Sequence, residues 1–192
     1  GRRPDVAFDP AGNATVVWDE NDGVRTSVWS RRYVATGASW TAATLVENDD
    51  TGSNGGPRVA VDPAGNAGVV WGWSSSPDYR SFANRWSAAT GRWGDAGPID
   101  AVTTNSACPQ VATDSSGNAG AVWCRISGSI LDIWTSRYDA VAGIWGDAGT
   151  LESGDGGNSM EPQIAMNGAG NTVVVWKKSD GVRWNIWARV YR

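Results

Sequence analysis

The stretch PRVAVDPAGNAGVVW, residues 57–71, occurs four times in this chain with small changes. The other copies are PDVAFDPAGNATVVW at 4–18, PQVATDSSGNAGAVW at 109–123 and PQIAMNGAGNTVVVW at 162–176. Their first prolines follow one another every 52 or 53 residues. A fixed period of this length is typical of repeat folds, in which each unit packs on the next. The sequence predicts one domain, 1–192, with the repeats 4–56, 57–108, 109–161 and 162–192.

Each repeat is predicted to contain four short strands. In the second repeat, Pro57 opens a strand rich in Val and Ala, and the turn DPAGN leads to the strand AGVVW. The Asp of such a turn caps its own backbone, Pro presets φ, and Gly takes a positive φ. A variable loop precedes the third strand, RSFANRW, and a fourth strand starts near Trp93.

Units of four strands with a recurring aromatic pattern are typical of β-propeller blades. An all-β propeller of four blades of about 52 residues is therefore expected, whereas a β-sandwich gives no reason for the period. The fourth repeat stops at Arg192, so its blade is expected to lack the outer strand and to present an open edge. Either the four blades close a ring, or they form an arc of a larger ring completed by a second copy or a longer chain. The arc is the favoured alternative.

The composition excludes several classes of function. The chain of 192 residues has a net charge of −4 and no His, so Ser-His-Asp and Cys-His catalysis and His-ligated metals are excluded. No basic stripe is present to bind nucleic acid. No apolar run is long enough for insertion into a membrane.

The two cysteines stand on either side of the third copy of the motif. Cys108 precedes its first residue and Cys124 follows its last. If this segment is a hairpin that turns near Ser116, the two residues lie opposite each other, within reach of a disulfide. Two buried free thiols are the alternative. A disulfide favours an oxidising compartment, so the protein is expected to be secreted or at the cell surface.

The repeat also resembles a known kind of protein. The unit P-x-V-A-x-D-x-x-G-N-A-x-V-V-W, followed by I-W-x-x-R-Y and W-G-x-A, is similar to a Trp-rich tandem repeat of secreted or surface proteins of bacteria. The resemblance implies a propeller outside the cytoplasm and brings no active site with it. The Asp-x-x-Gly-Asn turn is loosely similar to the Asp-box turn of sialidase-like propellers, although the Trp of each repeat comes later than in an Asp box.

Three sets of polar residues recur or cluster. The turn residues Asp9, Asp62, Asp114 and Asn167 are interpreted as turn caps, because the Asn cannot act as a general base. The loops DEND at 19–22 and ENDD at 47–50 could offer oxygen ligands to Ca²⁺, but their spacing favours solvated loops, and no cofactor or metal is expected. The arginines Arg32, Arg85 and Arg137 are interpreted as structural, bonding blade carbonyls or an Asp and packing their stems on Trp. Anion binding is the alternative role.

Two of the thirteen tryptophans, Trp73 and Trp184, do not occupy repeat positions. Both flank the loop between the second and third strands of a repeat, where an aromatic ring can stack on a sugar. With Tyr79, Arg80 and Arg183 they form the predicted ligand-binding set. Packing at a sheet edge is the alternative role for both rings.

These patterns predict a non-enzymatic, lectin-like module that binds carbohydrate or another extracellular ligand. The alternative is a structural repeat that assembles with other copies or with a larger surface protein. A sialidase-like glycosidase is the third hypothesis, disfavoured because the acidic residues fall in turns and loops and because a fold alone confers no activity.

Overall fold

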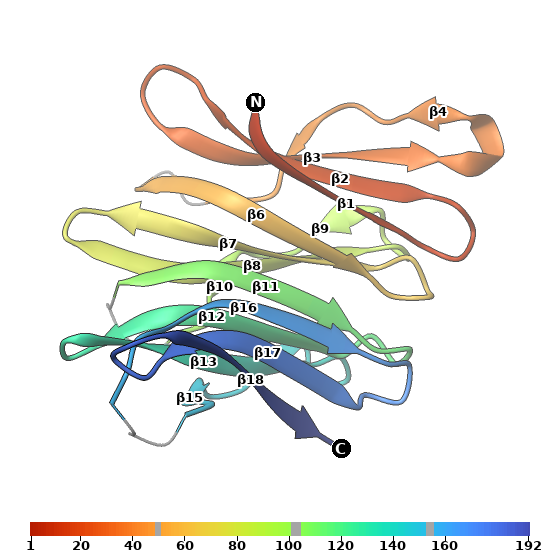
Figure 1. Cartoon of the computed structure of the whole chain (residues 1–192). Coiled ribbons are helices and arrows are strands. Elements are labelled where there is room, and N and C mark those ends of the chain that lie inside the picture. The colour runs from red at the N-terminus through yellow and green to blue at the C-terminus, as the bar shows by residue number, and fades with distance from the viewer. Residues whose placement is uncertain (49–50, 101–104, 153–155) are drawn as a thin grey trace.

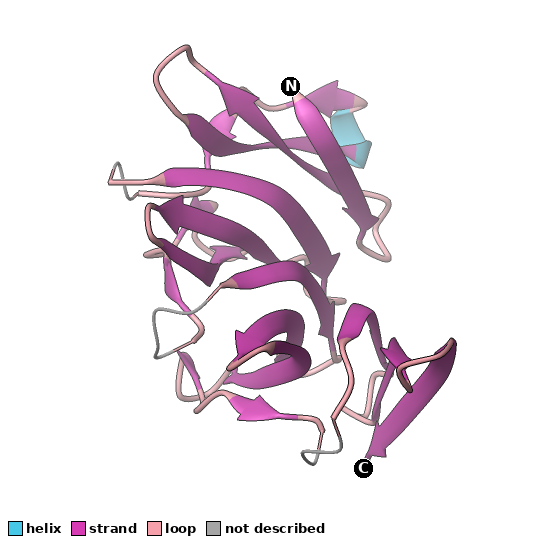
Figure 2. Ribbon diagram, turned by 60° about the vertical axis from the view of Figure 1, so that its left-hand side comes forward, coloured by secondary structure: helices cyan, strands magenta, loops and turns pink. Residues whose placement is uncertain are grey.

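The computed structural model describes residues 1–48, 51–100, 105–152 and 156–192. These residues form four antiparallel β-sheets that follow one another in chain order, from the N-terminal sheet to the C-terminal sheet (Figure 1). The only helical element in the described residues is the short 3₁₀ turn η1 (Ala35–Gly37) beside β4 (Figure 2). None of the described residues form a helix long and apolar enough to cross a membrane.

The first sheet contains β1 (Arg2–Phe8), β2 (Ala14–Asn21), β3 (Thr26–Val34), β4 (Ser39–Trp40) and β5 (Thr44–Leu45). The second contains β6 (Ser53–Val61), β7 (Ala67–Ser75), β8 (Asp78–Ser87), β9 (Arg92–Trp93) and β10 (Gly97–Pro98). The third contains β11 (Ser106–Thr113), β12 (Ala119–Ser127), β13 (Ile130–Asp139), β14 (Ile144–Trp145) and β15 (Gly149–Thr150). The fourth contains β16 (Ser159–Met166), β17 (Thr172–Ser179) and β18 (Trp184–Tyr191).

The predicted fourth strand is in fact broken into two short pieces. In the second sheet β9 and β10 both pair with β8, and Gly94, Asp95 and Ala96 lie between them. Gly, Asp and Ala are poor strand formers, which explains the interruption. The same two-piece edge is present in the first and third sheets.

The first strand of each sheet starts earlier than predicted. It begins before the repeat proline and passes through a bulge, as between Gly55 and Arg58 in β6. The residue before the proline has a positive φ in every sheet: Arg3, Gly56, Cys108 and Glu161. Because proline cannot donate to the ladder, a bulge is the place where a strand can accept it.

The turn between the first two strands is capped as predicted. The Asp62 Oδ1 atom accepts a hydrogen bond of 2.9 Å from the backbone N–H of Asn66. The same bond is present in the other three sheets, with Asn167 taking the place of Asp in the fourth. The four turn glycines share a φ of +83°, a backbone conformation that residues other than Gly rarely adopt.

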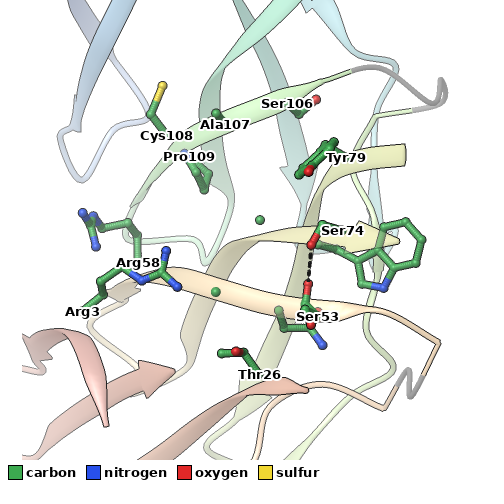
Figure 3. Close-up of a pocket in the computed structure, with 15 residues that line it drawn as sticks. Arg3, Thr26, Ser53, Arg58, Ser74, Tyr79, Ser106, Ala107, Cys108 and Pro109 are labelled. Atoms are coloured by element: carbon green, nitrogen blue, oxygen red, sulfur yellow. Dashed lines mark hydrogen bonds between the residues drawn. The ribbon is translucent and has the colours of Figure 1, made fainter. Parts of the chain in front are cut away.

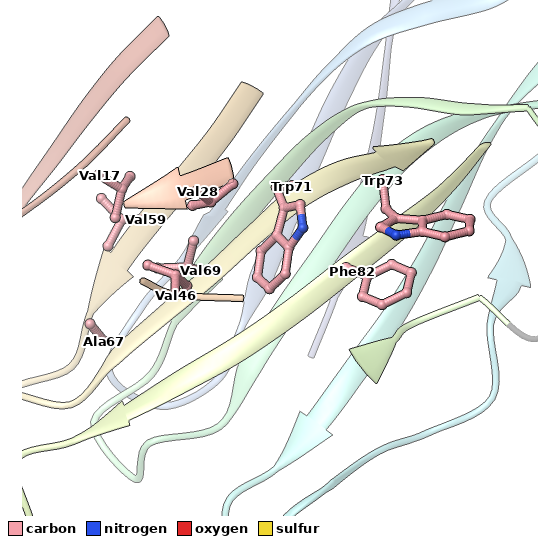
Figure 4. Packing of buried hydrophobic residues seen from close by; sticks show 9 residues of the cluster. All are labelled: Val17, Val28, Val46, Val59, Ala67, Val69, Trp71, Trp73 and Phe82. Atoms are coloured by element: carbon pink, nitrogen blue, oxygen red, sulfur yellow. The ribbon is translucent and has the colours of Figure 1, made fainter. Parts of the chain in front are cut away.

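The apolar core lies between successive sheets. Val17, Val28 and Val46 of the first sheet pack with Val59, Val69, Trp71, Trp73 and Phe82 of the second (Figure 4). Two further clusters join the second sheet to the third and the third to the fourth. One Trp on the second strand of each following sheet is buried in these clusters: Trp71, Trp123 and Trp176. The repeated indole rings therefore join each sheet to the one before it.

Recurring arginines also connect successive sheets. Arg85 donates from Nη2 to Asp62 Oδ2 at 2.8 Å and from Nη1 to the Gly117 carbonyl of the next sheet at 2.7 Å. Arg32 donates to the Gly65 carbonyl at 3.3 Å and lies over the Trp86 ring. The predicted bonds to carbonyls and to an Asp are therefore present, and Arg32 packs on a Trp as predicted, whereas Arg85 lies over the Tyr138 ring.

Cys108 and Cys124 form the predicted disulfide, with their Cα atoms 5.8 Å apart. The expected register differs by one residue, because Ala107 is the residue opposite Cys124. The bulge at Cys108 and Pro109 turns the Cys108 side chain toward its partner.

Candidate functional site

A cleft of about 410 Å³ opens where the first three sheets meet (Figure 3). It is bounded by the starts of β1, β3, β6, β8 and β11 and by the end of β7. The residues that line it are Arg3, Thr26, Ser53–Gly56, Arg58, Gly72–Ser74, Tyr79 and Ser106–Pro109. A volume in this range suits a small ligand or one or two sugar rings.

The bulge before the repeat proline shapes the cleft. Gly56 has a φ of +64°, and the guanidinium of Arg3 lies so close to Gly55 that a Cβ atom there would collide with it. Gly72 faces Gly55 across the β6–β7 ladder. Three glycines therefore leave peptide groups open to the cleft, where side chains would otherwise fill the space.

The charged groups that line the cleft are arginines. Arg3 makes a two-point contact with the buried Asp19, at 2.8 and 3.0 Å. Arg58 donates from Nη1 to the Pro57 carbonyl and forms no ion pair with a carboxylate of the described residues. No lining residue in the described part of the chain carries a carboxylate. The charge of Arg3 is therefore balanced by Asp19, and Arg58 supplies the positive charge of this surface in a chain that is acidic overall.

Two aromatic rings take different positions in the cleft. Tyr79 is about half exposed, whereas Trp73 is only 9% exposed and stacks on Phe82 with the ring centroids 5.4 Å apart. The guanidinium of Arg80 lies 5.9 Å from the Trp73 ring centroid. Tyr79 is therefore the aromatic face available to a ligand, and Trp73 supports the wall from the core.

A buried carboxyl group adjoins the wall. The Ser106 hydroxyl lines the cleft and donates to Asp100 Oδ2 at 2.5 Å. Burial raises the pKa of Asp100, and the hydrogen bonds from Ser106 and from the backbone of Ser81, with the charges of Arg125 and Arg80, oppose that effect. The net result is a carboxyl group that keeps its proton to higher pH than an exposed Asp.

The five predicted ligand-binding residues are divided by the fold. Trp73 and Tyr79 line the cleft, and Arg80 packs behind Trp73. Arg183 and Trp184 are on the fourth sheet and do not line the cleft, and Lys177 Nζ lies 5.0 Å from the Trp184 ring. Their predicted ligand role stays a prediction.

Sequence reasoning missed Arg3 and Arg58. Arg58 follows the repeat proline at a position where the other repeats have Asp5, Gln110 and Gln163. A polar residue that varies at a fixed place beside a repeated proline was the available signal. Arg3 could be recognised only with the bulge, which turns its side chain across Gly55.

The structure describes all of the acidic segment at 19–22 but only part of the one at 47–50. The prediction of a solvated loop at 19–22 is wrong for residues 19–21, which form the end of β2, where Asp19 is buried in its pair with Arg3. Asp22 follows the strand and accepts hydrogen bonds from the backbone N–H groups of Arg25 and Val24, which lower its pKa. Asp49 and Asp50 of the other loop lie outside the described residues. The described residues contain no cluster of three or more acidic or cysteine side chains that could hold a metal ion.

The fold is shared with solved structures of carbohydrate-active proteins. A Hadza microbial sialidase matches 100% of this chain and 44% of its own, with 14% identity and a TM-score of 0.69. A Penicillium chrysogenum α-L-arabinanase, solved with arabinobiose, matches 98% and 62%, with 11% identity and a TM-score of 0.66. An ulvan lyase bound to -[GlcA(1-4)Rha3S]- matches 96% and 51%, with 9% identity and a TM-score of 0.68.

At these identities the likeness shows the fold, which is β-propeller-like and all-β. The chain spans about half the length of the first solved structures it matches. No family model and no curated protein sequence matches the chain.

The prediction that the chain is not an enzyme is wrong in the light of these structures. The sialidase, the arabinanase and the ulvan lyase are enzymes, and each matches nearly the whole chain. The prediction depended on the absence of His and of clustered carboxylates along the sequence. In this fold, residues from separate sheets form a shared cleft, so spacing along the chain does not reveal which groups meet.

Proposed function

We propose that this protein recognises carbohydrate in the cleft between its first three sheets, and that its preferred ligands are acidic saccharides. The observation that carries this proposal is the lining itself: two guanidinium groups, several hydroxyls and a half-exposed Tyr79, with no carboxylate among the described lining residues. Guanidinium groups bind carboxylate and sulfate groups through paired hydrogen bonds. Sugar hydroxyls require donors and acceptors such as Ser53, Ser74 and Ser106.

The comparisons support carbohydrate as the ligand class. The sialidase, the arabinanase and the ulvan lyase all act on glycans, and two were solved with saccharides bound. In this proposal the four sheets are propeller blades of the Trp-rich tandem repeat, and together they are an arc of a larger ring. A secreted or surface location agrees with the disulfide between Cys108 and Cys124.

A glycan array with neutral, uronic, sulfated and sialylated saccharides tests this proposal. We expect signal on the acidic members and a steep loss of signal as salt rises, because ionic contacts are screened. Titration of the best ligand with Arg58→Ala should show affinity at least about tenfold weaker, since a hydrogen bond to a charged group is worth about 1.5–3 kcal/mol. Arg58→Lys should recover part of that loss.

Arg92→Ala is the matched control. Arg92 is exposed on β9 and pairs with Ser87, at the opposite end of β8 from Tyr79. Its removal changes the net charge from −4 to −5, as Arg58→Ala does, but outside the cleft, so it should leave affinity unchanged. A native chain that binds no saccharide on the array, or an Arg58→Ala loss equalled by Arg92→Ala, would refute the proposal.

A second candidate is glycan processing in the same cleft. It is favoured by the enzymes that share the fold and by Asp100, a carboxyl group beside the wall that is in contact with Ser106 and whose pKa is raised by burial. Carboxyl groups with a raised pKa serve as general acids in glycoside cleavage. Mass spectrometry of any bound glycan after long incubation tests this candidate, and an intact glycan excludes it.

A further inference from the structure

At each junction inside the molecule, the first strand of one sheet lies against the first three strands of the sheet before it. In the second junction, the side chains of Val111 and Thr113 on β11 lie over Gly68. In the third junction, Ile164 and Met166 on β16 lie over Gly120 in the same way. The molecule therefore repeats one mode of contact, in which two side chains of a first strand cover one position of the preceding second strand.

The fourth sheet presents the receiving face of this contact with nothing on it. Ile186 is 79% exposed, whereas its counterparts Val28, Ser81 and Ile133 are completely buried under the next sheet. Val173 and Val190, which pair with each other in the β17–β18 ladder, are 41% and 58% exposed. The Val175–Ala188 pair lies between Ile186 and the Val173–Val190 pair, so the open face is largely apolar along the β17–β18 ladder.

The residues of this face also differ in kind from their counterparts. Val190 occupies the position of the structural arginines Arg32, Arg85 and Arg137, and Val173 occupies that of Thr15, Gly68 and Gly120. The arginine that donates to the turn of a following sheet is therefore replaced by an apolar side chain. A partner for this face should be apolar at the same point.

The first sheet presents the complementary side. Val6 and Phe8 on β1 correspond to the pairs Val111 with Thr113 and Ile164 with Met166, which cover the preceding sheet. In the first sheet both are open, with 53% of Val6 and 65% of Phe8 exposed. The first and fourth sheets lie at opposite ends of the stack (Figure 1), so one chain cannot join its own two faces.

We propose that these faces bind a second copy of this chain head to tail. Phe8 and Val6 of one copy cover Val173 and Val190 of the other, which continues the contact already made three times within the molecule. Exposed apolar patches of this kind mark interaction surfaces. A contact between two different faces is heterologous, and two such contacts related by a twofold rotation close a dimer. This assembly does not depend on the cleft or its ligand.

Sedimentation velocity of the chain from about 1 to 200 μM tests the assembly. We expect a species of twice the 20.3 kDa chain mass that grows with concentration. Phe8→Glu and Val173→Arg should each weaken the dimer at least about tenfold, because each puts a charge into both contacts. Both positions are exposed in the single chain, so circular dichroism should show an unchanged fold, and Ile186→Lys offers an independent third variant.

A mixture of the two variants gives the decisive result. In a mixed pair, one contact is the native Phe8 with Val173, and the other joins the introduced carboxylate to the introduced guanidinium as an ion pair. Mixing Phe8→Glu with Val173→Arg should therefore restore dimers that neither forms alone. Val182→Glu, at a turn residue that is 93% exposed, should leave the dimer unaffected. A monomer at every concentration, a Phe8→Glu variant that still dimerises, or a mixture without recovery would overturn the head-to-tail contact.

Discussion

One pair of positions on the first two strands holds different residue types in each of the four sheets. The residue before the repeat proline and the residue that follows the conserved Trp form the pairs Arg3–Asp19, Gly56–Gly72, Cys108–Cys124 and Glu161–Lys177. In order, these are an ion pair, two glycines that leave room for the cleft, a disulfide, and an ion pair of reversed polarity. In the three sheets that have side chains at these two positions, the bulge brings the side chains into contact, so the backbone places the contact and the residue types decide its chemistry.

At the same scale, Asp100 should make stability depend on pH in a predictable direction. Its pKa is raised above 3.8, chiefly by burial, so the folded chain holds that proton more tightly than the unfolded chain. The contribution of this group to stability is present below its ordinary pKa and is lost as pH rises through the raised pKa. The free energy of unfolding of Asp100→Asn, relative to that of the native chain, should therefore be higher at pH 7 than at pH 4. Urea unfolding of both proteins at the two pH values measures this difference.

Asp139→Asn is the control of opposite sign. Backbone N–H groups of Ala142 and Val141 lower the pKa of Asp139, so its contribution is present above the ordinary pKa and fades as pH falls. This variant should be less stable than the native chain at pH 7, and the difference should shrink toward pH 3. Equal responses of the two variants to pH would contradict the assignment for Asp100.

At the scale of the strand and turn, how well the sequence predicts structure depends on whether local chemistry decides it. The turn DPAGN is predictable because the Asp cap and the Gly φ are set within five residues. The early start of β6 is not predictable from local sequence, because the ladder continues through the bulge only when β7 supplies the partners for Ser53 and Asn54. The split of the fourth strand at Gly94–Ala96 lies between these cases. The composition of this segment indicates a low strand propensity but does not show where the strand breaks.

The arginine that joins the second sheet to the third gives a prediction at the same scale. Arg85 is mostly buried and donates to both Asp62 and the Gly117 carbonyl, so Arg85→Ala leaves two acceptors without their donor. We expect a loss of about 2–3 kcal/mol in the free energy of unfolding, measured with urea. Arg92→Ala, at an exposed position on β9, should change it by less than about 0.5 kcal/mol. Similar losses in both variants would show that the bonds across the junction contribute nothing.

At the scale of the whole molecule, the cleft was only half predictable for a reason that follows from the fold. Its aromatic wall, Trp73 and Tyr79, comes from one hairpin and could be located from the sequence. Its two guanidinium groups, of Arg3 and Arg58, belong to different sheets and converge only when those sheets pack. Trp184 flanks the corresponding loop of the fourth sheet, which does not contribute to the cleft.

The same packing makes stability unequal along the stack, and one pair of residues tests this. Ile133 and Ile186 occupy the same place in the third and fourth sheets, but Ile133 is completely buried and Ile186 is 79% exposed. In dilute solution Ile133→Ala should cost about 2–5 kcal/mol, because a cavity opens between two sheets. Ile186→Ala should cost less than about 0.5 kcal/mol, because nothing covers it. If a second copy binds the fourth sheet, the loss of unfolding free energy caused by Ile186→Ala must increase with protein concentration by mass action. The loss caused by Ile133→Ala should not increase in this way, because Ile133 lies inside one chain. Urea unfolding at about 1 and 100 μM separates the two cases, and an Ile186→Ala cost that does not change with concentration would show that this face stays open in solution.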